Sequence, residues 1–255
     1  MDRRQSLALL AAAALVPGAR AQTAPNLNLV VPVPPGGSVD LTARLLGEHL
    51  PKTLKQNVVI ENKPGASGSI AAAGVARQAG DENTLMLVFD SHVTNPLVYP
   101  TLGYPPKDFT PISRLLSFPL VFAVPASLPV NTLAEFIALA KKKPGALNVS
   151  SAGLGTLNHL AAELFKMMGG VEMLRVPYRG SAQMVPDLIR GQVTVAFDGI
   201  SSSIEHIRAG RIRALAVTPA TRAQALPDVP TVGETVPGYV GGGWYWPGQT
   251  IRDLQ

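Results

Sequence analysis

The sequence contains no cysteine among its 255 residues. Disulfide bonds, thiol chemistry and a lipid-modified cysteine anchor are therefore excluded. Charged residues make up only 15% of the chain and the formal net charge is +5. The basic residues are scattered rather than clustered, so nothing points to nucleic-acid binding. The enzyme motifs G-x-S-x-G, G-x-x-x-x-G-K-[ST] and H-E-x-x-H are also missing.

The chain also lacks a hydrophobic run long enough to cross a membrane as a mature helix. Its longest apolar stretch, 7–16, follows Arg3 and Arg4 and precedes the small-residue site 19–21. That three-part layout predicts a cleavable signal peptide over residues 1–21. The arginine pair fits twin-arginine export only loosely, so the export route stays open. We expect a soluble periplasmic protein.

Hydrophobic residues make up 46% of the sequence, which is enough for a packed core and unlike a disordered chain. Apolar strand-like runs alternate with amphipathic helix-like runs from residue 26 onward. Ser38 is the expected N-cap of the first helix, Asp40 lies in its first turn, and Pro186 should kink or shorten a later helix. This alternation predicts an α/β fold with mainly parallel sheets flanked by helices. Strands are expected at 26–33, 57–62, 83–90, 119–126, 147–153, 175–178, 192–199 and 211–218.

The alternation lapses between Leu97 and Ser113 into turns rich in proline and tyrosine. We interpret this lapse as a crossing between two lobes. The predicted first domain is 22–98, with 225–255 returning to it, and the second is 99–224. Two α/β lobes joined in this way form a cleft, and ligands bind such sheets beyond the strand ends, next to helix N-termini.

Two glycine-rich loops at strand-to-helix turns are the strongest candidates for a binding site. Gly36-Gly37-Ser38 lies in the first predicted lobe and 150–156 (SSAGLGT) in the second. Each offers unpaired backbone N–H groups, a hydroxyl and the positive end of a helix. As a pair across a cleft they would hold a carboxylate without an arginine. Either loop alone would be interpreted as an ordinary tight turn.

Two further polar residues follow predicted strands. We expect His92 to face the cleft, because it lies in the polar segment that follows the strand 83–90. Asp198 ends the strand 192–199, where its carboxylate would accept a hydrogen bond from an amine or hydroxyl of a ligand. Capping of the next helix is an equally good role for Asp198.

The four histidines, His49, His92, His159 and His206, show no metal-ligand spacing, so no metal or cofactor is expected. A secreted serine hydrolase stays open as an alternative, because catalytic triads are set by geometry and not by spacing. It would use Ser38 or Ser151 as nucleophile. Its partners would be Asp198 and either His92 or His159.

Seven blocks of the sequence resemble one family. They are PVPPGGSVDLTARLL, VVIENKPGASGSIAA, FDSHVTNP, SSAGLGTLNHLAAELFK, VPYRGSAQMVPDLIRGQVTVAFD, GRIRALAVT and LPDVPTVGE. They are similar to successive blocks of the Bug-type family, the extracytoplasmic solute receptors of tripartite tricarboxylate transporters, and cover the chain from about Leu29 to Trp244. The resemblance implies a monomeric, two-domain Venus-flytrap protein. It would bind a small carboxylate (a di- or tricarboxylate, an aromatic acid or an amino acid) and deliver it to a cognate membrane transporter.

The resemblance also implies which residues bind the ligand. The loops 34–40 and 151–158 would grip its carboxylate from opposite domains, while 91–95 and Asp198 would line the distal half of the cleft. The predicted site consists of Pro35, Gly36, Gly37, Ser38, Asp40, Ser91, His92, Asn95, Ser151, Gly153, Gly155, Thr156, Asn158 and Asp198.

The sequence departs from the family pattern in two places. Residues 80–83 read Gly-Asp-Glu-Asn where the family usually has Pro-Asp-Gly-Tyr. Family members continue well beyond the tryptophan that matches Trp244, whereas this chain diverges into GGGWYWPGQTIRDLQ. We therefore expect the first lobe to lack part of its covering and to expose apolar surface. A non-functional truncated relative is the third interpretation.

Overall fold

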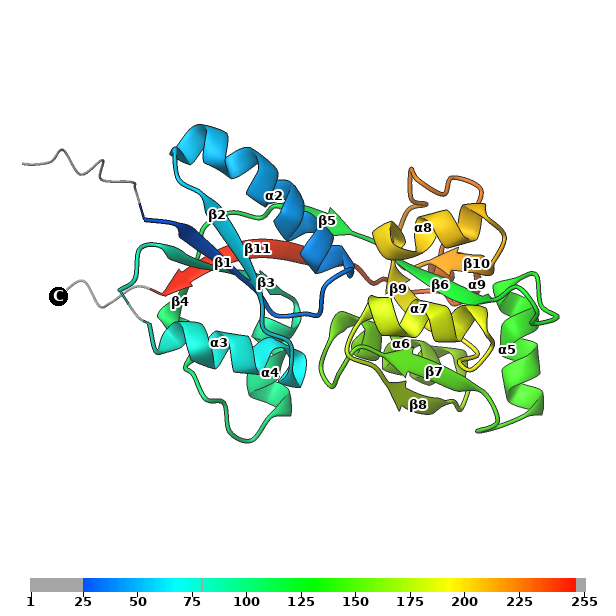
Figure 1. Ribbon diagram of the computed structural model, residues 1–255. Helices are drawn as coiled ribbons and strands as arrows, with labels where there is room; N and C mark the ends of the chain where they lie inside the picture. The colour runs from blue at the N-terminus through cyan, green and yellow to red at the C-terminus, as the bar shows by residue number, and fades with distance from the viewer. Residues whose placement is uncertain (1–24, 79, 251–255) are drawn as a thin grey trace, which may run out of the picture.

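The computed structural model describes residues 25–78 and 80–250, and the predicted signal peptide, 1–21, lies outside them. Two lobes lie side by side and are joined by extended segments (Figure 1). The first lobe is built on one sheet with strand order β2-β1-β3-β11-β4, in which β5 also pairs with β11. The second lobe contains the sheet β10-β6-β9 and the strand pair β7-β8.

The first lobe buries both faces of its sheet under helices. Successive residues of β1 point to opposite faces, so that Leu29 and Val31 pack with α2 while Val30 packs with α3. Its elements are β1 (Leu27–Val31), α2 (Ser38–Leu54), β2 (Val58–Asn62), a 3₁₀ turn (Ala66–Gly68), α3 (Ser69–Ala76), β3 (Thr84–Phe89), α4 (Ser91–Val98), a second 3₁₀ turn (Pro106–Asp108), β4 (Phe109–Pro111), β5 (Leu116–Phe118) and β11 (Gly243–Thr250).

The core of the second lobe is an aromatic cluster centred on Phe122 of its central strand. The Phe122 ring lies 4.9–5.0 Å, centroid to centroid, from the rings of Phe136, Phe165 and Phe197. The lobe comprises β6 (Leu120–Pro125), α5 (Leu133–Lys142), β7 (Asn148–Ser151), α6 (Leu157–Gly169), β8 (Leu174–Pro177), α7 (Ser181–Ile189), β9 (Ala196–Gly199), α8 (Ile200–Arg208), β10 (Ile212–Val217) and α9 (Val232–Thr235).

The expected α/β class and two-lobed binding-protein architecture are confirmed, with sheets of mixed strand sense. β2, β1 and β3 are parallel, but β11 runs antiparallel to β3, and β6 runs antiparallel to both β9 and β10. The reason lies in the crossings. β6 carries the chain away from the cleft into the second lobe and β11 carries it back, so each opposes the strands that end at the cleft.

The change of lobe occurs later in the chain than residue 99, where the sequence placed it. β4 and β5 both pair with β11 in the first sheet, so the crossing follows Phe118. The return is also later than residue 225, because Val232, Val236 and Tyr239 belong to the core of the second lobe. The turns rich in proline and tyrosine belong to the first lobe, since the edge of β11 pairs with the short strands that follow them.

Three local features differ from the sequence-based expectation. The segment SHVTNP forms helix α4 instead of a polar loop. Gly37, and not Ser38, is the N-cap of α2, and Ser38 is its first helical residue. Helix α7 continues past Pro186 and ends at Ile189. Within the described residues, no helix combines the length and apolar character needed to cross a membrane.

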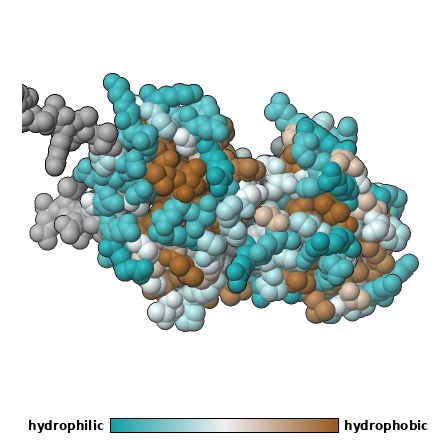
Figure 2. Space-filling view, in the orientation of Figure 1, coloured by the Kyte–Doolittle hydropathy of each residue, from teal (hydrophilic) through white to brown (hydrophobic). Residues whose placement is uncertain are grey.

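Exposed apolar side chains occur on both lobes. Figure 2 shows hydrophobic patches on each lobe, set in a mostly hydrophilic surface. Leu45 on α2 is 59% exposed and Leu97 on α4 is 87% exposed, but Met167 and Leu174 of the second lobe are equally open, at 74% and 63%. We expected exposed apolar surface on the first lobe in particular. The exposed apolar side chains are instead found on both lobes.

Candidate functional site

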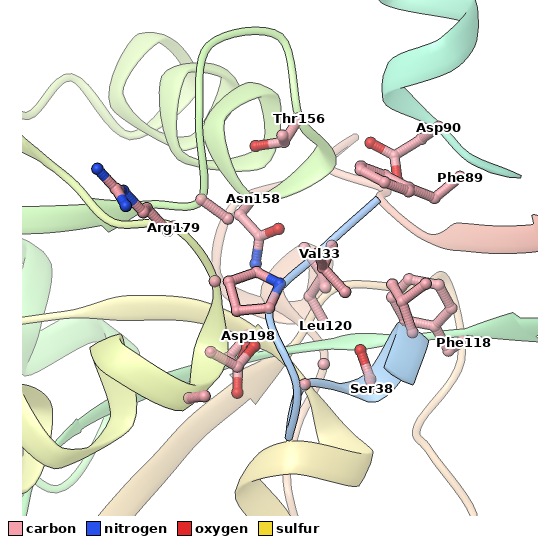
Figure 3. Close-up of a pocket in the computed structure, with 18 of the residues that line it drawn as sticks. Val33, Ser38, Phe89, Asp90, Phe118, Leu120, Thr156, Asn158, Arg179 and Asp198 are labelled. Atoms are coloured by element: carbon pink, nitrogen blue, oxygen red, sulfur yellow. The ribbon is translucent and has the colours of Figure 1, made fainter. Parts of the chain in front are cut away.

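A pocket lies between the lobes where the starts of three helices meet (Figure 3). The first lobe contributes the loop before α2, and the second contributes the loops before α6 and α7. Strand ends and three aromatic residues complete the wall. The lining residues include Val33, Pro34, Gly37, Ser38, Phe89, Asp90, Phe118, Leu120, Ala152, Thr156, Asn158, Arg179, Gly180, Ser181, Ala182, Asp198, Gly199 and Tyr245.

The loop before α2 is held in shape by Asp40 beneath it. Gly36 has a φ of +91°, a conformation that favours glycine. Its N–H donates to Asp40, which also accepts hydrogen bonds from the Asn62 amide and from the Arg44 guanidinium, all between 2.8 and 3.1 Å. Burial raises the pKa of Asp40, but the bonds from Arg44, Gly36 and Asn62 outweigh burial, so the pKa is lowered. Asp40 therefore shapes the loop from behind and does not line the pocket.

The loop before α6 is shaped by glycines and neutral hydrogen bonds. Gly153 has a φ of +125°, and a side chain there would meet the Ser67 hydroxyl of the first lobe. The Thr156 hydroxyl donates to the Gly153 carbonyl at 2.8 Å, and the Gly155 N–H donates to His159 Nδ1 at 3.1 Å. Burial lowers the pKa of His159, which keeps that nitrogen an acceptor. His159 is thus a support for the loop.

Asp198 lies at the end of β9 and is completely buried. Its carboxylate accepts hydrogen bonds of 2.5, 2.6 and 2.7 Å from the hydroxyls of Ser181, Ser202 and Ser203. Burial raises its pKa against the effect of these three bonds. Asp198 lines the pocket and joins the starts of α7 and α8 through these serine hydroxyls. Gly199, and not Asp198, is the N-cap of α8.

Asp90 is a second carboxylate of the pocket, and sequence reasoning missed it. It follows β3 directly and is partly buried, and it accepts a hydrogen bond from the N–H of Leu157 at the start of α6. Burial raises its pKa to about 6. Its position after a strand, like that of Asp198, is the signal that could have identified it.

Tyr245 lines the pocket together with the two carboxylates and contacts the first loop. Its hydroxyl lies 2.6 Å from the Ser38 hydroxyl and shares a hydrogen bond with it. Burial, and after it the charges of Asp90 and Asp198, raises the pKa of Tyr245. Its ring lies 4.5 Å from that of Phe118, centroid to centroid, and forms an apolar wall. The pocket is therefore polar at its ends and apolar between them.

The lobes touch across the cleft through hydrogen bonds. The Ser67 hydroxyl donates to the Leu154 carbonyl at 2.7 Å, and the Thr94 hydroxyl donates to the Gly155 carbonyl at 2.6 Å. With the bond between Asp90 and Leu157, three residues of the first lobe hold the loop before α6. The structure is that of a closed cleft.

Only part of the predicted site lines this pocket: Gly37, Ser38, Thr156, Asn158 and Asp198 do. Pro35 is exposed on the loop before α2, Gly36 and Asp40 shape that loop, and Gly155 supports the second one. Gly153 lines an adjoining cavity beside Ser67. Ser151 is buried and donates to the Gly153 carbonyl at 3.2 Å.

The residues predicted from SHVTNP lie behind the pocket, on helix α4. Ser91 and Asn95 donate to the Ser67 carbonyl at 2.7 and 3.2 Å. His92 packs between the rings of Tyr104 and Phe109. These residues hold the 3₁₀ turn that carries Ser67, so their influence on the cleft is indirect.

The residues of the hydrolase alternative do not come together. The side-chain hydroxyl of Ser38 bonds to Tyr245, and that of Ser151 bonds to the Gly153 carbonyl. In the part of the chain that the structure describes, neither serine shares a hydrogen bond with a histidine. Among the residues that the structure describes, neither of these two serines is activated as a nucleophile, since each would need a base within hydrogen-bond reach.

Comparison with known proteins gives consistent results. The model of the "Tripartite tricarboxylate transporter family receptor" matches residues 42–246. The chain is 37% identical over 247 residues to the UPF0065 protein in the tcbD-tcbE intergenic region of Pseudomonas sp. (strain P51), covering 94% of this chain and 74% of the relative.

Two solved structures share the fold at substantial identity. R. palustris Rpa4515 with adipate gives a TM-score of 0.87 at 40% identity, over 92% of this chain and 79% of the other. The periplasmic binding protein BugD gives 0.85 at 33% identity, over 89% and 77%. Proteins of this family are periplasmic solute receptors and not enzymes. The resemblance found in the sequence is confirmed: the chain belongs to the tripartite tricarboxylate transporter receptor family, the Bug-type solute receptors.

Proposed function

We propose that this protein binds a small carboxylate between its lobes and delivers it to a tripartite tricarboxylate-type membrane transporter. The observation that carries the proposal is the pocket itself, where the starts of α2, α6 and α7 converge from both lobes. Helix starts present free N–H groups and a positive potential, which suit a carboxylate. The adipate bound to Rpa4515 supports this class of ligand.

The apolar wall fits the body of such a ligand. Val33, Phe89, Phe118 and Leu120 lie between the polar ends of the pocket. Because the ligand would contact both lobes, binding stabilises the closed form over the open one. A membrane transporter that recognises only the closed form would then receive only loaded receptor. We further propose that the receptor is exported to the periplasm and acts as a monomer.

A thermal-shift screen of the chain from Gln22 tests the proposal. The panel contains mono-, di- and tricarboxylates, aromatic acids and amino acids. A ligand at about 100 times its Kd adds roughly 2.7 kcal/mol to the free energy of unfolding, so a matching acid raises the Tm by several degrees. We expect Ser38→Ala to weaken binding about tenfold, because it removes a hydroxyl from the pocket wall.

Ser127→Ala is the matched control, since Ser127 is exposed just beyond β6 and outside the pocket. It should leave the shift unchanged. A protein that melts sharply but responds to no carboxylate would contradict the proposal. Turnover of ester substrates that is abolished by Ser38→Ala or Ser151→Ala would instead support the hydrolase.

A further inference from the structure

The charged groups of the pocket are distributed unevenly. Two carboxylates, Asp90 and Asp198, line it, and among its described lining residues the only cationic side chain is Arg179. Figure 3 shows Arg179 and Asp90 on opposite sides of the pocket. The pocket thus has an electropositive end at Arg179 and an electronegative end at Asp90.

Asp90 occupies the anion-binding position at the start of α6. The N–H of Leu157, the first residue of that helix, donates to the Asp90 carboxylate from across the cleft. A helix start that already holds a carboxylate of the protein does not offer the same N–H group to a ligand. The Asp90 carboxylate therefore already offsets part of the positive potential at the start of α6, before any ligand binds.

The start of α7 differs from that of α6, because its carboxylate, Asp198, bonds to the Ser181 hydroxyl and not to a backbone N–H of the helix. Its N-cap is Gly180, which provides no side-chain cap, and Arg179 directly precedes it. Gly180, Ser181 and Ala182 all line the pocket. Free N–H groups next to a guanidinium form the better of the two positions for a ligand carboxylate.

Among the described residues, the Asp90 carboxylate accepts a hydrogen bond from the Leu157 N–H and forms no ion pair, whereas Asp40 in the same lobe is paired with Arg44. A second ligand carboxylate at this end would therefore face Asp90, and like charges in a partly enclosed site repel strongly.

We propose that Asp90 is a specificity-determining residue that restricts the ligand to acids with a single carboxylate and a hydrogen-bond donor at the far end. The carboxylate lies at Arg179 and the start of α7. The donor, a hydroxyl, amide or ammonium group, lies at Asp90. The inference rests on the proposed function and predicts a preference different from that of Rpa4515, whose structure contains adipate.

Calorimetric titration with matched acids tests this inference at pH 7.5. The probes are adipate, 6-hydroxyhexanoate and 6-aminohexanoate, and the four-carbon series succinate, 4-hydroxybutanoate and 4-aminobutanoate. We expect the wild type to bind the preferred donor-bearing acid at least tenfold more tightly than the dicarboxylate of the same length. Asp90→Asn should reduce that ratio at least tenfold, because asparagine can still accept the Leu157 hydrogen bond but carries no charge.

Asp90→Ser is a second variant that removes the charge with a smaller side chain, and Asp228→Asn removes an exposed surface charge as the control. Only the two Asp90 variants should change the ratio. Tighter binding of a dicarboxylate by the wild type, or an unchanged ratio in both Asp90 variants, would overturn the inference and leave the proposed function intact. Failure of all six probes to bind, where a dicarboxylate or tricarboxylate of the thermal-shift panel does bind, would overturn the inference alone, and no response to any acid of that panel would contradict both.

Discussion

Asp40 and Asp90 lie in the same lobe, each at the start of a helix, but in opposite electrostatic surroundings. Asp40 is 1% exposed and is paired with Arg44, Asn62 and Gly36, all in its own lobe. Asp90 accepts its hydrogen bond from the other lobe and forms no ion pair with any residue that the structure describes. The pKa of Asp40 is accordingly lowered, and burial raises that of Asp90.

The difference separates carboxylates that build the fold from those that face a ligand. A buried carboxylate whose hydrogen-bond acceptors are all occupied stabilises the loop above it. A carboxylate that lies in a cleft without a paired cation lowers the stability of the fold. Such a carboxylate is typical of a functional site, where it serves binding or catalysis. Asp198 is intermediate between these cases. Three serine hydroxyls donate hydrogen bonds to its carboxylate, but they carry no positive charge to offset the carboxylate's negative charge.

The largest effect should come from removing the charge of Asp40. Asp40→Asn replaces an acceptor of four hydrogen bonds by a group that accepts fewer and leaves Arg44 unbalanced. We expect the free energy of unfolding to fall by roughly 2 kcal/mol, measured by urea denaturation at pH 7.5. Asp90→Asn should change it by less than about 0.5 kcal/mol or raise it. Equal losses in the two variants would remove the distinction between these carboxylates.

The pH dependence of stability should differ in sign between the two residues. The pKa of Asp90 rises from 3.8 to about 6 on folding, so between these values the folded state binds more protons than the unfolded state. Its contribution to stability therefore falls as the pH rises from about 4 to 6. Asp40 behaves oppositely: its pKa is lowered, and its contribution is lost as the pH falls below about 4.

Urea denaturation of the wild type and both asparagine variants across pH 3.5–8 measures these contributions. The wild type should lose stability relative to Asp90→Asn as the pH rises through this window, and should lose it relative to Asp40→Asn as the pH falls. Asp228→Asn serves as the surface control. Parallel curves for wild type and Asp90→Asn would show that Asp90 is solvated like an ordinary surface carboxylate.

Local patterns in the sequence were enough to predict β1–β3, β6–β10, most helices and the two glycine-rich loops, but not β4, β5 and β11. The φ values of Gly36 and Gly153, and the helix starts behind them, depend on residues close in the chain. Helix α4 was missed because His92 and its polar neighbours favour turns, and packing against Tyr104 and Phe109 decides their conformation.

The electronegative end of the pocket could not be predicted in the same way. Asp90, Leu157 and Tyr245 are far apart in the sequence, and they meet only because the lobes close and β11 returns beside β3. The alternation of apolar residues gives no information about either event. Asp198 was predicted, but its three serine partners come from two helices whose relative placement requires the folded lobe.

The smallest effect should come from the neutral hydrogen bonds that accompany Asp90 across the cleft. Thr94→Val keeps the shape of the side chain and removes its 2.6 Å bond to the Gly155 carbonyl. One such bond contributes about 0.5–1.5 kcal/mol, so the Kd for the best carboxylate should rise two- to tenfold. The unfolding free energy should stay close to that of the wild type, because Thr94 and Gly155 belong to different lobes and can be hydrated when the cleft opens. Thr110→Val, at an exposed position of β4, is the matched control and should leave the Kd unchanged. If Thr94→Val lowered stability without weakening binding, the contact would belong to the fold, as the network of Asp40 does, and closure would depend on the ligand and on the contacts of Asp90 and Ser67.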